Sequence, residues 1–435
     1  MRYIVIFIFI LFVSCSEQKV EKRATAGFYI NVIDSLDNRA DHFLLSSIVK
    51  DIEIVPLEMN ENYLYRKINN IVMGSKDIFL NGTGHVLRYS REGKFLNPVG
   101  TKGMGPSDHM YAKGIGIDDT SHIVYVLSGI TPHIKAYTYE GKFIKATQIA
   151  PDGSIINGTD HSARKGTNRG SAYAFIDKMH FLRRMLPIWD GSSDIWLMQR
   201  LDTAGRIVRS FYDPVNRGKE KGILSHGADG VNLIPAYWTE VSPVINRYGE
   251  NMNILYEGND TVYGYNIADN VLKRRHILLC GQRPDFVQLR KMGKEADYFR
   301  YLMIVDVMET EKYIFFVGEK DSDSYLIRVS KEDGSIKTVM QEGEIKESQL
   351  MGIIYRLVDY PHFIDDMSGG LPFTPVYHDE KHWIDIRQPE ELLEMNLEKL
   401  KNTDVILPEM REKLIHMIEN LKEDDNPVLI IATLK

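Results

Sequence analysis

Two similar stretches, "YSREGKFL" (Tyr89–Leu96) and "YTYEGKFI" (Tyr137–Ile144), decide the fold of this chain. Each stretch places strand-forming residues on both sides of a Glu-Gly-Lys turn, and its glycine, Gly93 or Gly141, lies at the same position. Glycine is favoured where a tight hairpin turn requires a positive φ. The two stretches therefore predict the same β-hairpin in two copies of a repeating unit.

The segments around these turns predict four strands in each copy. Short runs rich in β-branched and aromatic residues, separated by turn residues, are typical of β-strands. The runs of the first copy are "NNIVMGS", "DIFLNG", "VLRYS" and "KFLNPVG", and those of the second are "GIGID", "HIVYVLS", "IKAYTY" and "KFIKATQI". A four-stranded unit repeated at about 40–50 residues is typical of a β-propeller blade.

The turn position recurs three more times along the chain. Gly205 and Gly334 occupy it in "LDTAGRIV" and "SKEDGSIK", and Asn270 occupies it in "NIADNVLK". Asparagine tolerates left-handed φ better than most other residues. The five turns indicate five blades.

A sixth blade is expected from residues 352–387. Its missing strand would come from the other end of the chain, either "DIEIVPLE" at 51–58 or "NPVLIIATLK" at 426–435. Such closure leaves no long unpaired strand edge. The predicted fold is therefore all-β: a six-bladed β-propeller of four-stranded blades over residues 41–435.

A segment at about 388–423 departs from the strand pattern. "QPEELLEMNLEKLKN" and "LPEMREKLIHMIENLKEDD" carry apolar residues at helical spacing, and Pro389 and Pro408 stand where helices begin. The pattern predicts two amphipathic helices near the C-terminus, inserted in the propeller and packed on it.

The N-terminal stretch "MRYIVIFIFILFVSC" predicts export. Residues 1–15 have a basic Arg2, an apolar run too short to span a bilayer comfortably, and Ser14-Cys15 at the cleavage point. The stretch resembles a bacterial lipobox, which implies a lipid on Cys15 and a tether over residues 16–40. An outer-membrane lipoprotein on the periplasmic or the cell-surface face is expected; an ordinary signal peptide with an incidental cysteine is the alternative.

The composition narrows the classes of partner. The chain of 435 residues has 53 basic and 60 acidic side chains, a net charge of −7, and no long basic run, which argues against nucleic acid. After cleavage before Cys15, Cys280 would be the one other cysteine, so no internal disulfide is expected in the mature body. Cys280 lies in an apolar run and is expected to be a buried small hydrophobe.

Four stretches carry a family resemblance: "VGTKGMGPSDHMYAKGIGID" (99–118), "IVYVLS" (123–128), the two "EGKF" turns and "DNPVLIIATLK" (425–435). The chain resembles the six-bladed β-propeller lipoproteins of gut-type Gram-negative bacteria, and is distantly similar to NHL-repeat propellers. Gly105-Pro106 keeps the first half of the family's glycine-rich loop, while Ser107 to His109 replace or extend the second half. The resemblance implies fold and compartment, and it implies no reaction.

Candidate chemistry is sparse. "GTKGMG" at 100–105 lacks the spacing of a phosphate-binding loop, and His378, Asp379 and His382 in "HDEKH" are expected on a hairpin, where they share no helix face. The carboxylate pairs Asp365/Asp366 and Asp321/Asp323 are expected in turns. No cofactor is expected; a divalent ion such as Ca²⁺ in the central channel is compatible with the fold but is not indicated. Channel candidates near inner or second strands are Glu257, Asp118, Asp177 and His180.

The binding face is predicted from the blade geometry. Compact glycine turns lie on one side of a propeller, and the longer connectors between blades lie on the other side with the turns between the second and third strands. Function concentrates on loops held by a rigid scaffold. The candidate ligand-binding residues on this longer-loop face are His85, His109, Tyr111, His133 and Arg164.

Three functions remain open from sequence. The first is a non-catalytic, lipid-anchored binding or scaffold protein for a glycan, a peptide or a protein partner of the cell envelope. The second is a metal-dependent hydrolase or lyase of the lactonase or NHL type with its site in the central channel. The third is a structural subunit of an envelope complex.

Overall fold

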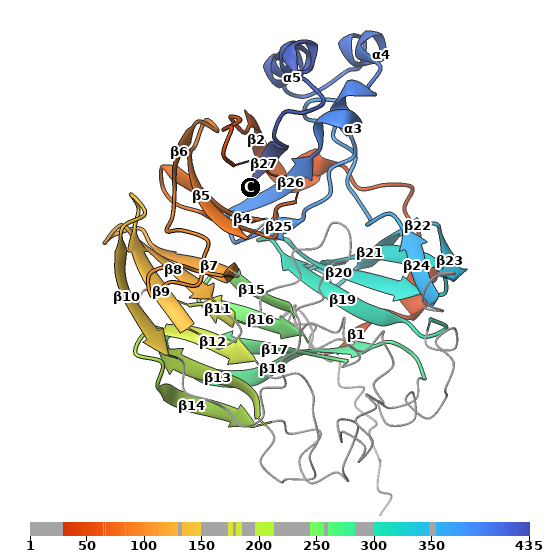
Figure 1. The fold of residues 1–435 in the computed structure, drawn as a ribbon. Helices are drawn as coiled ribbons and strands as arrows, with labels where there is room; N and C mark the ends of the chain where they lie inside the picture. The colour runs from red at the N-terminus through yellow and green to blue at the C-terminus, as the bar shows by residue number, and fades with distance from the viewer. Residues whose placement is uncertain are drawn as a thin grey trace, which may run out of the picture.

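The computed structural model shows a ring of β-sheets that follow one another in chain order (Figure 1). It describes residues 29–63, 65, 67–82, 84–110, 112–128, 133–148, 173–176, 180–184, 196–212, 244–255, 260–282, 299–347 and 354–435. The first strands of neighbouring sheets contact one another, as β3 does with β7, β7 with β11, and β15 with β19. These strands are therefore the inner strands of a propeller-like, all-β arrangement.

The first three sheets are four-stranded antiparallel meanders. The first contains β3 (Asn70–Met73), β4 (Asp77–Gly82), β5 (His85–Ser90) and β6 (Phe95–Pro98). The second contains β7 (Ala112–Asp118), β8 (Ile123–Ser128), β9 (His133–Thr138) and β10 (Phe143–Gln148). The third contains β11 (Tyr173–Phe175), β12 (His180–Arg184), β13 (Trp196–Asp202) and β14 (Ile207–Tyr212). The first two match the runs predicted from sequence.

The next two sheets continue the ring. One contains β15 (Val244–Tyr248), β16 (Asn251–Leu255), β17 (Thr261–Asn266) and β18 (Val271–Leu279), with β1 (Tyr29–Asn31) added parallel to β18 as a fifth strand. The other contains β19 (Met303–Glu309), β20 (Tyr313–Lys320), β21 (Asp323–Ser330) and β22 (Ile336–Gln341). The 3₁₀ helix η1 (Asp34–Asp37) follows β1, so both of these elements lie within residues 16–40, the segment expected to be a tether.

The last large sheet joins the two ends of the described chain. Its order is β2 (Val49–Pro56), β27 (Val428–Leu434), β26 (His382–Arg387) and β25 (Tyr377–His378). β27 pairs antiparallel with β2 from Val49 opposite Leu434 to Pro56 opposite Val428. Both strands that were considered for closure are therefore used, where the prediction asked for one.

Two details of the predicted propeller are wrong. Five of the described sheets have four strands and the one that holds β1 has five, so six sheets of four strands are not what the structure shows. The run "GIIYRLVDY" does not enter the closing sheet, because β24 (Ile354–Val358) pairs instead with β23 (Gly343–Glu347) in a separate two-stranded sheet. β24 therefore pairs with the strand that precedes it in the chain, β23.

The helical segment also differs from the prediction in the number and length of its helices. It contains three short helices, α3 (Pro389–Leu393), α4 (Leu397–Lys401) and α5 (Pro408–Asn420), in place of two. The first predicted helix is divided because the side chain of Asn396 accepts the backbone N–H of Lys399 at 3.0 Å and starts a new helix there. Buried apolar side chains of the helices pack against the closing sheet: Leu392, Leu400, Leu414 and Ile418 contact the cluster that includes Ile54 and Val428.

The repeated turns have the geometry that the sequence predicted. φ is +89° at Gly93 and +81° at Gly141, and it is also positive at Gly205, Asn270 and Gly334. The backbone N–H of Gly93 donates to Ser90 at 3.0 Å, and that of Gly141 donates to Thr138 at 2.9 Å. A Cβ at Gly93 would lie 2.2 Å from the carbonyl oxygen of Pro56, and one at Gly141 would lie 2.3 Å from that of Pro98. The glycine of each turn therefore lies so close to the last residue of the preceding sheet's outer strand that a side chain would not fit.

The largest core cluster fills the space beside the closing sheet. Phe315 of β20, Phe363 and Trp383 of β26 are fully buried and meet edge to face or tilted, with ring centroids 5.4 to 5.8 Å apart. Aromatic pairs of this geometry contribute beyond the area that they bury. Cys280 is buried in a second cluster, as predicted.

Candidate functional site

The candidate histidines lie at the strand ends predicted for the longer-loop face. His85 begins β5 and His133 begins β9, which are the third strands of their sheets. His109 lies in the connector between β6 and β7. Tyr111 and Arg164 fall outside the described residues. The structure therefore brings His85 and His109 together around the first two sheets and leaves the other two positions unplaced.

The connector formed by residues 99–110 is held rigidly against the second sheet. The ammonium group of Lys135 donates to the backbone carbonyls of Asp108 and Gly105, and the hydroxyl of Tyr137 donates to the carbonyl of Ser107 at 2.7 Å. The N–H of His109 donates to Thr101 at 2.9 Å, which ties the two arms of the loop. A loop with this many internal bonds is preorganised, as binding loops on scaffolds are.

His109 is the unusual side chain of this connector. It is 1% exposed, and neither ring nitrogen has a hydrogen-bond partner among the described residues. Its ring meets Tyr137 edge to face at 5.9 Å. Burial, followed by the positive charges of His85 and Lys135, lowers the pKa of His109 to about 4 although Asp108 opposes this. At neutral pH the imidazole is therefore uncharged.

His85 completes a small polar patch at the mouth of the connector. Burial and the charge of Lys102 lower the pKa of His85, and the ring of Tyr63 meets His85 edge to face at 5.2 Å. We call His85, Lys102, His109 and Lys135 the connector patch. The imidazole of His85 and the ammonium groups of Lys102 and Lys135 can form hydrogen bonds with hydroxyl, amide or anionic groups of a ligand, while the ring of His109 is buried.

A second polar cluster lies on the inner strands of three sheets. Asp306 of β19 accepts hydrogen bonds from Tyr360 at 3.0 Å and from Asn246 of β15 at 3.3 Å, and Nε2 of His378 on β25 lies 3.8 Å from the same carboxylate. The side chains of Asp306 and His378 are about nine-tenths buried. Asn246, Asp306, Tyr360 and His378 form what we call the inner cluster.

Of the inner cluster, only His378 is among the residues singled out from the sequence. His378 was grouped there with Asp379 and His382. In the structure His382 lies beside Asp379, with 3.5 Å between Nδ1 and Oδ1, whereas His378 lies beside Asp306. Asp306 stands in the continuous apolar run "MIVDVME", and no spacing signal connects it to a histidine so far along the chain. Within the ranges that the structure describes, no three His, Cys, Asp or Glu side chains gather as a metal site.

Two of the other carboxylates considered from sequence, Asp365 and Asp118, stabilise turns, whereas Asp366 accepts hydrogen bonds from Ser46. Asp365 is buried and accepts the N–H groups of Met367, Ser368 and Gly370 at 2.9 to 3.0 Å. Asp118 accepts the N–H groups of Thr120 and Ser121 at 3.1 and 3.3 Å. His180 lies on β12, and Glu257 and Asp177 lie outside the described residues. Turn stabilisation therefore accounts for Asp365 and Asp118.

The fold is a propeller-like all-β arrangement whose first two sheets carry the connector patch. The chain belongs to the family described as DUF4934, a domain of unknown function, whose model matches residues 28–433. None of the helices in the described part of the chain is long and apolar enough to cross a lipid bilayer.

Two solved structures are similar in fold to this chain to different degrees. An exported protein from Bacteroides fragilis is 14% identical, with a TM-score of 0.58 over 94% of this chain and 99% of that one. A member of the DUF4221 family from Bacteroides vulgatus is 12% identical, with a TM-score of 0.45 over 68% of this chain and 86% of that one. The first likeness supports the fold alone. A comparison with curated proteins finds no significant match.

Proposed function

We propose that the protein is an exported, lipid-anchored binding or scaffold protein of the cell envelope, without catalytic activity, which binds a glycan, a peptide or a protein partner through the connector patch. The observation that carries this proposal is the connector, which Lys135 and Tyr137 hold in place and which carries the exposed Lys102 beside His85. Within the part of the chain that the structure describes, the buried ring nitrogens of His109 also have no hydrogen-bond partner. An unsatisfied buried polar group costs stability, so its presence suits a role in binding.

The proposed ring has six blades, with the β1-containing sheet as one of them. In that reading β15 to β18 form a four-stranded blade and β1 is an added outer strand. This arrangement agrees with the resemblance to six-bladed lipoproteins and distantly to NHL-repeat propellers.

The binding proposal is tested with purified mature protein and arrays of envelope glycans and peptides. We expect a specific ligand whose affinity falls about tenfold in His85→Ala and in Lys102→Ala, the loss associated with an important polar contact. Lys337→Ala, on β22, is the control and keeps its affinity. Equal affinity in all of these variants would remove the connector patch as the site.

The anchor proposal is tested in cells that incorporate labelled palmitate. We expect label on the wild-type protein in the outer-membrane fraction, and neither label nor membrane association in Cys15→Ala. Protease treatment of intact cells then decides between the periplasmic and the cell-surface face. Label retained in Cys15→Ala would show that the lipobox resemblance is incidental.

A channel-centred hydrolase or lyase is the second candidate, favoured by the inner cluster. Asp306 and His378 are a carboxylate and an imidazole close enough to work as a general acid–base pair. Incubation with a lactone and ester panel, with and without divalent ions, tests this candidate. Turnover that is abolished in Asp306→Asn would favour it, whereas no turnover by the wild type would disfavour it.

A further inference from the structure

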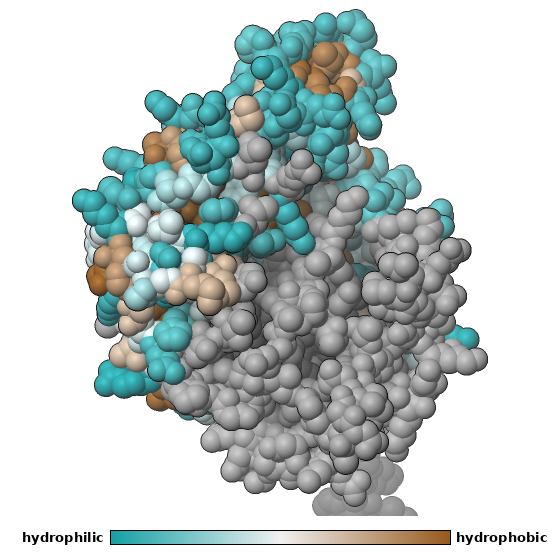
Figure 2. Space-filling view, in the orientation of Figure 1, coloured by the Kyte–Doolittle hydropathy of each residue, from teal (hydrophilic) through white to brown (hydrophobic). Residues whose placement is uncertain are grey.

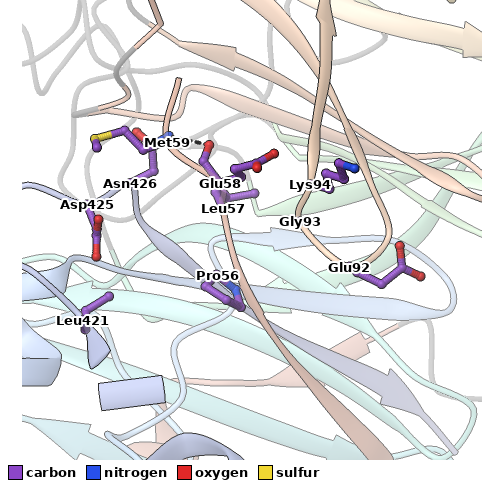
Figure 3. Close-up of a pocket in the computed structure, with 10 residues that line it drawn as sticks. All are labelled: Pro56, Leu57, Glu58, Met59, Glu92, Gly93, Lys94, Leu421, Asp425 and Asn426. Atoms are coloured by element: carbon purple, nitrogen blue, oxygen red, sulfur yellow. Dashed lines mark hydrogen bonds between the residues drawn. The ribbon is translucent and has the colours of Figure 1, made fainter. Parts of the chain in front are cut away.

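An open groove lies on the other side of the molecule from the connector patch's loops, beside the helical segment. It has a volume of about 390 Å³ and is lined by the end of β2, the turn between β5 and β6, and the segment between α5 and β27. In Figure 3, Leu421 and Asp425 stand on one side, Glu92 and Lys94 on the other, and Pro56 to Glu58 lie between them. Its size is within the range of ligand pockets in proteins.

The groove combines carboxylates with apolar surface. The groove is lined by three carboxylates and one cation: Glu58, Glu92, Asp425 and Lys94. Met59 is 46% exposed, and Pro56, Leu57 and Leu421 supply further apolar lining. A ligand that fits both properties carries positive charge and an apolar part.

Each of the three carboxylates is fixed by a local hydrogen bond. Oε2 of Glu58 accepts the N–H of Phe95, Oε2 of Glu92 accepts the hydroxyl of Ser90, and Oδ2 of Asp425 accepts the N–H of Lys422, all at 2.8 Å. An ionised carboxylate has about four acceptor positions, so one bond holds its direction and leaves acceptor capacity for a ligand. Preorganised groups of this kind lose little entropy on binding.

The surrounding surface has the same sign of charge. Residues 388–426 contain 11 acidic and 5 basic side chains, a net charge of −6 in a chain whose total is −7. In Figure 2, hydrophilic side chains cover most of this helical end of the molecule. Leu393 and Ile406 of the same segment are exposed apolar side chains. A concentrated negative field attracts basic partners and repels a second copy of this acidic chain.

We propose that this groove is a docking site for a basic, partly apolar segment of another protein. Lysine or arginine side chains of the partner would meet Glu58, Glu92 and Asp425, and an apolar side chain would cover Met59 and Leu421. In Figure 1 the groove's elements lie at the upper end of the molecule and β1 lies at the lower right. A chain tethered ahead of β1 would therefore leave the groove accessible to a partner.

The repeat supplies a matched control for the experiment. Glu92 and Glu140 occupy the same position of the two Glu-Gly-Lys turns, but only Glu92 lines the groove. The probe is a fluorescein-labelled 12-residue peptide of alternating lysine and leucine, titrated with the mature protein. Peptides of glutamate and leucine, and of lysine and serine, test the need for charge and for apolar contact.

We expect binding of the lysine–leucine peptide that weakens about tenfold in Glu92→Lys and about threefold in Met59→Ser, but less than about twofold in Glu140→Lys. The lysine–serine peptide binds more weakly and the glutamate–leucine peptide does not bind. No binding, or equal loss in Glu92→Lys and Glu140→Lys, overturns the proposal. Dimerisation of the wild type that Glu92→Lys abolishes also overturns it, because the occupant would then be a second copy.

Discussion

At the scale of single residues, two separate physical effects favour glycine in the repeated turns, and not every turn has both. A positive φ disfavours a side chain by about 1–2 kcal/mol at any of these turns. Gly141 adds a close approach, since a Cβ would meet the carbonyl oxygen of Pro98 at 2.3 Å, whereas a Cβ at Gly334 would meet nothing within 4 Å.

The two positions should respond differently to alanine. We expect Gly141→Ala to lower the free energy of unfolding by about 3 kcal/mol or more, because the backbone of the preceding sheet must shift, and Gly334→Ala to lower it by about 1 kcal/mol. Urea unfolding followed by tryptophan fluorescence measures both. Equal losses would show that the contact with Pro98 carries no energy.

His109 should make the protein sensitive to mild acid. Its pKa is about 4 when folded and near 6.5 when unfolded, so its contribution to stability is complete above pH 6.5 and is lost as pH falls towards 4. The loss would be about 3 kcal/mol. We expect His109→Leu to flatten this part of the pH profile and to be more stable at pH 4.5 than the wild type, as measured by urea unfolding at several pH values.

At the scale of elements, an ionic network joins the sheets of β18 and β19. Glu309 ends β19 with its side chain 1% exposed, and it accepts hydrogen bonds from Arg275 at 2.6 Å and pairs with Lys331 at 2.7 Å. Asn253 also donates to it at 2.8 Å. Burial raises the pKa of Glu309, but Arg275 and these hydrogen bonds outweigh burial, so the pKa is lowered.

Neutralising Glu309 should weaken the junction. Glu309→Gln leaves Arg275 and Lys331 without their shared partner, and we expect a loss of about 3 kcal/mol in the free energy of unfolding at pH 7. Because the folded pKa is lowered, the difference from wild type should shrink as pH falls through that pKa. Thermal unfolding at pH 7 and pH 3 measures this. A full-sized difference at pH 3 would show that packing, and not charge, is the cause.

Local elements were predictable where their signal was local. The turn glycines and the runs of the first two sheets carry their own pattern, and they were placed correctly. β1 has only three residues, too few for its alternation of exposed and buried side chains to be recognised in the sequence. β24 pairs with its neighbour β23, and its sequence pattern alone does not distinguish this partner from a strand of the closing sheet.

At the scale of the whole molecule, the ring depends on strands from both ends of the described chain. β27 lies between β2 and β26, so removing it separates two other strands of the closing sheet. The inner cluster also joins residues far apart in the chain, because Asp306 on β19 and His378 on β25 belong to two different sheets. No local pattern links these two residues, so Asp306 could not be found from sequence, and the binding face of the connector patch stays a prediction.

A chain that ends at Asn426 should fail to form the native ring. We expect loss of the cooperative thermal transition and association through the exposed edges of β2 and β26. Size-exclusion chromatography and circular dichroism compare it with a chain that begins at Tyr29 and retains every described strand. A compact, cooperatively unfolding product without β27 would contradict the closing role.

The pairing of β2 with β27 also constrains when the protein can fold. Val49 and Leu434 meet across the whole intervening chain, so a ribosome or an export channel that has released only part of the polypeptide holds a molecule that cannot close. Contacts of such sequence separation form late and slowly. For the export proposed above, this delay would leave the chain open to threading through a narrow pore until both of its ends have passed.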